Sequence, residues 1–92
     1  MSEQEFASIQ DVWRFAENAR RAAEARGLTQ LAGQFYDALN LGSSALEILG
    51  AIQKIVLENR EILNEVLPTA SQADTQRVIA FVDAAFGRAS PQ

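Results

Sequence analysis

The chain has 92 residues, with 8 Lys and Arg against 12 Asp and Glu, and it contains neither cysteine nor histidine. The missing residue types exclude disulfides, thiolate chemistry and zinc sites built from Cys and His, and they remove the commonest general base. A net charge of −4 disfavours nucleic acid and anionic membranes as partners, because both bind through clustered Lys and Arg.

Size and composition predict a single helical domain over residues 1–92. Apolar residues make up 48% of the chain, which argues against intrinsic disorder. No apolar run approaches the roughly 20 residues that span a bilayer, and the first residues lack the basic and then apolar pattern of a signal peptide. We therefore expect a soluble cytoplasmic protein with frayed ends at about 1–7 and 88–92.

Apolar residues recur with helical rather than alternating spacing, which predicts an all-α fold of four helices at roughly 8–26, 29–41, 44–67 and 71–87. Ser8 with Asp11 resembles a capping pair at the start of the first helix, and Gly27 is placed to end it in a left-handed conformation. Trp13 lies on the apolar face of this helix and is expected in the core. Arg20 is expected to stack on Trp13 or to pair with Glu17 or Glu24.

The second helix carries Gly33 at its centre, where glycine costs about 1 kcal/mol relative to alanine. A close helix crossing over Gly33 would explain its presence. Gly42 is placed to end this helix, and Ser44 with Glu47 fits a capping box for the next one. The stretch between them therefore predicts a plain turn. An anion site at the helix mouth is the alternative, which the carboxylate of Glu47 disfavours.

The third helix is predicted to be the longest element and to lie at the centre of the fold. A stripe with 3-4 spacing runs along it: Ala45, Ile48, Ile52, Ile55, Asn59, Ile62 and Val66. Pro68 stops this helix. The opposite side of this helix carries its acidic residues and is expected to face solvent. These residues are Glu47, Glu58, Glu61 and Glu65. A carboxylate metal site is disfavoured because it would need inward-facing Glu and His.

The last helix, at 71–87, is expected to begin with a cap formed by Ser71 and Asp74 and to end at Gly87. Val78, Ile79 and Val82 lie on its buried stripe.

Asn59 is the one polar residue in the stripe of the third helix. In coiled coils such an Asn sets register and oligomeric state, whereas inside a monomer it would bond to backbone or water. Leu57 and Phe81 fall off the apolar stripes of their helices, so each marks either a contact surface or additional core. The candidate protein interface consists of Asn59, Leu57, Arg60, Phe81, Arg77 and Tyr36.

These residues include no recognisable pair of nucleophile and base, and we expect neither enzymatic activity nor a cofactor or metal. The sequence instead predicts a helical protein–protein interaction module that self-associates as a homodimer through the apolar face of the third helix. The alternative is an acidic neutralising partner, of the immunity-protein or antitoxin type, that binds a basic protein. A carrier of a small apolar ligand is a further alternative that no residue favours.

Overall fold

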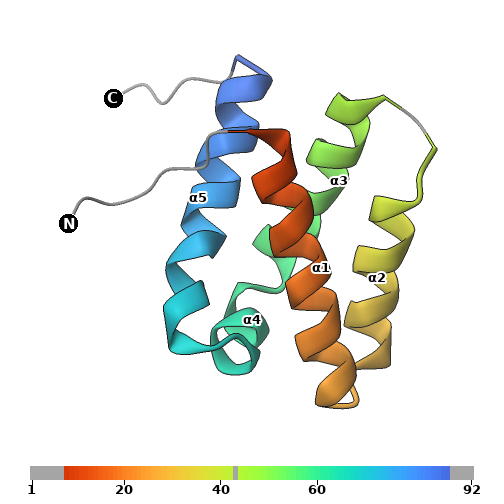
Figure 1. Cartoon of the computed structure of the whole chain (residues 1–92), viewed down its shortest axis with the longest axis vertical. Coiled ribbons are helices and arrows are strands. Elements are labelled where there is room, and N and C mark those ends of the chain that lie inside the picture. Colours follow the sequence, from red (N-terminus) through yellow and green to blue (C-terminus); the bar gives the residue numbers. More distant parts are fainter. Residues whose placement is uncertain (1–7, 43, 88–92) are drawn as a thin grey trace.

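The computed structural model describes residues 8–42 and 44–87, and over these ranges the chain forms five helices and no strand. The helices are α1 (Ile9–Ala25), α2 (Thr29–Leu39), α3 (Ala45–Glu58), α4 (Arg60–Val66) and α5 (Thr69–Ala85), as Figure 1 shows. The all-α class is confirmed. The four-helix count is wrong, because the predicted helix at 44–67 is divided at Asn59. The expected frayed ends at 1–7 and 88–92 lie outside the described residues.

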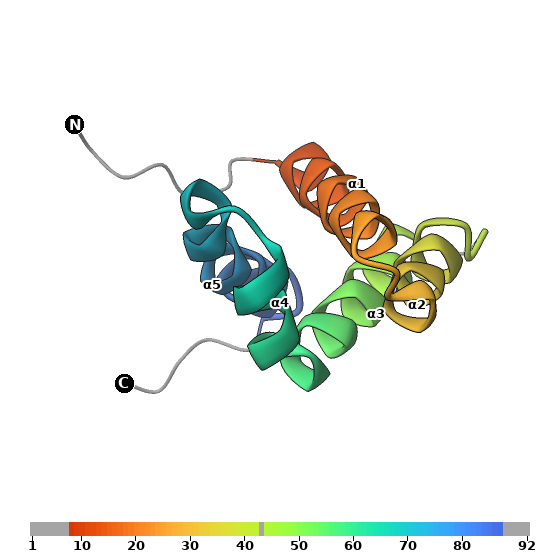
Figure 2. The same cartoon turned by 90° about the horizontal axis from the view of Figure 1, so that it is seen from below.

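The helices form two groups that share a core. In Figure 2, α1, α2 and α3 lie together on one side, and α4 and α5 lie on the other. α1 and α2 pack as a pair joined by the turn at Gly27, and α3 packs against both α2 and α5. The short helix α4 contacts α1, α3 and α5, so it closes one end of the molecule (Figure 1).

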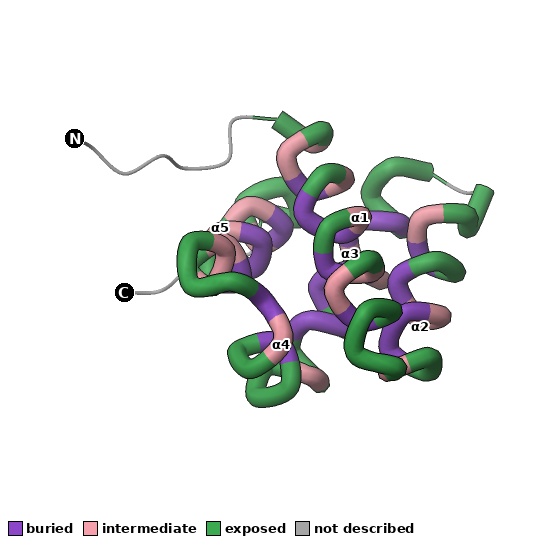
Figure 3. Tube along the Cα trace, turned by 60° about the horizontal axis from the view of Figure 1, so that its bottom comes forward, coloured by how far each residue is buried: buried purple, intermediate pink, exposed green. Residues whose placement is uncertain are grey.

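The core contains the residues that the helical spacing selects. Val12 on α1, Phe35 on α2, Ile52 on α3, and Val78 and Val82 on α5 are fully buried. Figure 3 shows the buried segments on the sides of the helices that face one another. Because all five helices contribute to this one cluster, burial of their apolar faces is the main force that holds the fold together.

The helix ends agree in part with the signals in the sequence. Gly27, Gly42 and Gly87 all have positive φ values, of 76°, 71° and 74°, as a left-handed turn after a helix requires. The N–H of Ser8 donates to the carboxylate of Asp11 at 3.2 Å, and Ser44 Oγ accepts from the N–H of Glu47 at 3.3 Å. Both serines therefore begin helices, as predicted.

Two predicted boundaries are wrong. α2 ends at Leu39 rather than Leu41, and α5 begins at Thr69, directly after Pro68, rather than at Ser71. Proline has a fixed φ and no N–H, so it suits the position just before a helix. Ser71 lies inside the first turn as a result, and Asp74 pairs with Arg77 at 2.6 Å instead of forming a cap.

The predicted helix crossing over Gly33 is also wrong. A Cβ built at Gly33 would have no described atom within 4 Å outside its own helix. The close approach is found at Gly50 on α3, where a Cβ would lie 3.3 Å from the ring of Phe86. A side chain larger than hydrogen is therefore crowded at Gly50, between α3 and Phe86, and not at Gly33 on α2.

Candidate protein-binding surface

The surface of interest is built around the break between α3 and α4. Asn59 has φ −123° and ψ 28°, outside the helical region, although neither Gly nor Pro lies between residues 51 and 67. Its N–H still bonds to the carbonyl oxygen of Ile55, and its own carbonyl accepts from the N–H of Leu63. The chain therefore changes direction over a single residue, with hydrogen-bonded helix on both sides.

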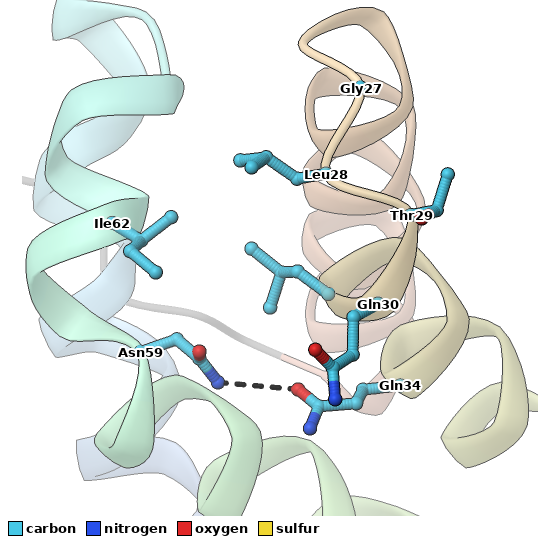
Figure 4. A pocket seen from close by; sticks show the side chains of 8 residues that line it. Gly27, Leu28, Thr29, Gln30, Gln34, Asn59 and Ile62 are labelled. Carbon is cyan, nitrogen blue, oxygen red and sulfur yellow. Dashed lines mark hydrogen bonds between the residues drawn. The ribbon is translucent and has the colours of Figure 1, made fainter.

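The side chain of Asn59 holds this break in place. Its Nδ2 donates to the carbonyl oxygen of Ile55 at 2.8 Å and to Oε1 of Gln34 on α2 at 3.3 Å (Figure 4). Asn is well suited here, because a short amide can satisfy backbone groups at a helix end. The half-buried amide is therefore bonded both to its own helix and to a residue 25 positions earlier in the chain.

The break turns α4 relative to α3 and changes which residues are buried. Leu63 is fully buried, whereas Ile62, which belongs to the predicted stripe, is 41% exposed. Leu57, at the end of α3, is 47% exposed. The apolar face of α3 itself, at Ile48, Ile52 and Ile55, is buried within the chain, so it is not available for the homodimer contact predicted there. The apolar surface left accessible near Asn59 therefore comes from Leu57 and Ile62.

A groove lies beside these residues, between α4 and the corner that joins α1 to α2. It has a volume of about 440 Å³ and is lined by Leu28, Leu31, Ile62 and the amides of Gln30, Gln34 and Asn59, together with Gly27 and Thr29. Ile62 and Leu28 face each other across it in Figure 4. A second hollow of about 360 Å³, lined by residues 57–62, adjoins it through Asn59 and Ile62. We call Leu28, Gln34, Leu57, Asn59 and Ile62 the kink surface.

Charged groups border the kink surface. Glu58 and Glu61 line the second hollow, and neither forms an ion pair with another described residue. Arg60 lines the same hollow, and its guanidinium donates to Oε1 of Gln76 on α5 at 3.2 Å. Arg26 donates to the backbone oxygen of Glu65 at 3.2 Å and so connects the end of α1 to α4.

The six predicted interface residues do not form one surface. Leu57, Asn59 and Arg60 meet at the break and all line the second hollow. Tyr36 is 57% exposed on α2 and lines neither hollow. Phe81 on α5 is partly buried and packs against the core, and Arg77 pairs with Asp74 on its own helix. The candidate site is therefore the kink surface, which joins Leu57 and Asn59 to Leu28, Gln34 and Ile62 and is bordered by Arg60.

The expected role of Arg20 is confirmed in its ion-pairing form. Its guanidinium bonds to Glu17 at 3.0 Å and to Glu24 at 2.9 Å. The hydrogen bond that Arg20 donates to Glu17 is the main cause that raises the pKa of Arg20 above its ordinary value, and the charge of Glu24 adds to it. Trp13, expected in the core, is only partly buried and packs against it. Both residues therefore support the fold of α1.

Sequence reasoning missed one buried polar contact. Gln53 is 7% exposed on α3, and its Nε2 donates to the carbonyl oxygen of Ile79 at 3.1 Å and to Oδ1 of Asp83 at 2.9 Å. This contact connects α3 to α5. The sequence does carry a signal for this contact. Gln53 lies next to Ile52 at the edge of the apolar stripe, where a polar residue needs a hydrogen-bond partner.

The described residues contain no group of three or more acidic side chains that could hold a metal ion. None of their helices is both long and apolar enough to cross a membrane. The chain matches no family model, and comparisons with curated proteins and with solved structures give no match either.

Proposed function

We propose that this protein is a non-enzymatic helical interaction module that self-associates as a homodimer through the kink surface. One observation supports this above the others: Leu57 and Ile62 are 47% and 41% exposed on either side of Asn59, next to a groove lined by aliphatic side chains and amides. Aliphatic side chains grouped around one polar amide are typical of helical interfaces with a defined register.

The chemistry of the groove supports recognition rather than catalysis. Its lining side chains are aliphatic groups, three amides and the hydroxyl of Thr29, and none of them titrates near neutral pH. General acid–base catalysis needs a titratable group within reach of the reacting atoms. Amides and aliphatic groups instead provide shape and hydrogen bonds for a partner surface.

Sedimentation equilibrium over a hundredfold range of protein concentration tests this proposal. The wild type is expected to show a reversible monomer–dimer equilibrium, which Ile62→Glu abolishes because it puts a charge into the interface. Leu46→Glu is the matched control, since Leu46 is 45% exposed at the other end of α3. A monomer at every concentration, or equal loss of the dimer in both variants, contradicts the proposal.

A second candidate function is supported by Glu58 and Glu61. Because these carboxylates have no ion-pair partner among the described residues, a basic protein could bind over the same hollow. A lysine-rich amphipathic peptide is expected to bind the wild type and Glu47→Lys, but not Glu61→Lys. Equal binding to both variants, or binding to none of the three proteins, contradicts this candidate.

A further inference from the structure

The break at Asn59 interrupts a stripe that is regular in the sequence. Ala45, Ile48, Ile52, Ile55, Asn59, Ile62 and Val66 alternate steps of three and four residues without exception, as in the seam of a continuous amphipathic helix. Ile48, Ile52 and Ile55 of this stripe are buried before the break, whereas Ile62 is 41% exposed beyond it. The local sequence therefore favours one continuous helix over residues 45–66, whereas the tertiary contacts of a single chain favour the break.

Two features of the fold oppose a straight helix. The amide of Asn59 bonds to Gln34 on α2, which fixes the position of the break. Leu63 and Leu67 are 0% and 4% exposed, because the turn at Asn59 carries them into the core. If the helix straightened in an isolated chain, both leucines and the apolar face of α5 would enter water, at a large cost in free energy.

A second copy of the chain removes this cost. If two chains straighten together, α4 and α5 of each chain can pack against α1, α2 and α3 of the other, with the same core contacts as before. Straightening also restores the backbone hydrogen bonds between the last turn of α3 and the first turn of α4, which the break interrupts. Leu57, Asn59 and Ile62 would then lie where the two straight helices meet.

We propose that the homodimer forms by exchange of α4 and α5 between two chains, with Asn59 as the hinge and its bond to Gln34 as the latch. This inference rests on the proposed self-association and specifies how the two chains join. The partner copy is the occupant because only an identical chain supplies the pocket that Leu63 and Leu67 leave. The exchanged segment begins at Arg60, and the retained segment ends at Glu58.

The contact between Arg26 and Glu65 gives a direct test, because α1 is retained and α4 is exchanged. The guanidinium of Arg26 lies 3.2 Å from the backbone oxygen of Glu65, and both residues are exposed. The chain has no cysteine, so Arg26→Cys with Glu65→Cys introduces a unique pair of thiols. A short bismaleimide added to the isolated dimer joins two chains if α4 is exchanged, and stays within one chain if it is not.

The expected result is a covalent dimer on a denaturing gel from the dimer fraction and a covalently closed monomer from the monomer fraction. A dimer fraction that gives only closed monomers overturns the exchange and leaves the proposed self-association standing. A double variant with the circular dichroism of the wild type but no dimer at any concentration contradicts both proposals.

Substitution of the hinge gives a second, independent test. Asn59→Leu removes the latch and favours the straight helix, so we expect the dimer dissociation constant to fall by about tenfold. Gln34→Ala removes the latch alone and should shift the constant in the same direction by less. Gln30→Ala is the matched control, because Gln30 lines the same groove and forms no hydrogen bond with Asn59. Weaker dimerisation of Asn59→Leu overturns the hinge assignment.

Discussion

Gln53 is a polar residue on α3 whose side chain is buried and supports the fold instead of facing solvent. Its buried amide bonds to the backbone of Ile79 and to the partly buried carboxylate of Asp83, so α3 and α5 are connected by polar groups at the edge of the apolar core. In a low-dielectric interior such bonds contribute more than they do at the surface, and loss of one partner leaves the other without its bond.

Gln53→Ala is expected to lower the free energy of unfolding by about 1–3 kcal/mol, because it removes a buried donor that serves two acceptors. Urea denaturation followed by circular dichroism measures the change. Gln30→Ala, at an exposed position, should stay within about 0.5 kcal/mol of the wild type. Equal effects of the two substitutions would show that the contact between α3 and α5 contributes little.

Gly33 and Gly50 provide a matched pair, because both lie inside helices and only one is crowded. Gly33→Ala should stabilise the protein by about 0.5–1 kcal/mol, since the added methyl meets no described atom within 4 Å beyond its own helix. Gly50→Ala should stabilise it less, or destabilise it, because the methyl would lie 3.3 Å from the ring of Phe86. Thermal unfolding of both variants compares them, and a larger gain for Gly50→Ala would contradict the packing described for α3 and α5.

Among the elements, the end of α1 could be predicted closely and the division of α3 from α4 could not. Gly27 and the capping residues Ser8 and Ser44 act over a few residues of chain, so their patterns are visible in the sequence. The break at Asn59 depends on Gln34, which lies 25 residues away, and on the pocket that buries Leu63. Local propensity favours a continuous helix there, and tertiary contacts override it.

Part of the candidate site could likewise be predicted from the sequence, and part of it could not. Asn59, Leu57 and Arg60 stand out locally, as a polar residue in an apolar stripe and its neighbours, and the structure brings them together at the break. Leu28 and Gln34 carry no such signal, because only the folded chain brings the start of α2 beside the break at Asn59. Phe81 departs from its stripe in the sequence, yet it packs against the core.

Two adjacent residues on α4, Ile62 and Leu63, provide a test of the break between α3 and α4. Leu63→Ala is expected to lower the free energy of unfolding by about 2–5 kcal/mol, because Leu63 is fully buried. Ile62→Ala should cost less than about 1 kcal/mol in the monomer, since Ile62 is 41% exposed. Denaturation at low protein concentration isolates the monomer. The reverse order of the two effects would indicate a continuous helix in the isolated chain.

For the whole molecule, net charge determines how salt affects association. Each chain carries a net charge of −4, so two copies repel each other at low ionic strength. Raising the salt concentration from about 0.05 M to about 0.5 M screens this repulsion and should lower the dimer dissociation constant. Binding of a basic partner at Glu58 and Glu61 would weaken under the same change. Light scattering at the two salt concentrations therefore separates the two candidate functions.

Hydrogen exchange at two protein concentrations tests self-association through the kink surface most directly. The first turn of α4 begins at Arg60, and in the single chain its N–H groups have no intrahelical acceptor. We expect slower exchange at residues 60–62 when the protein is concentrated, while the centre of α1 is unchanged. Exchange at residues 60–62 that is independent of protein concentration would contradict self-association through the kink surface. Protection that appears at Tyr36 or Leu46 instead would contradict it as well.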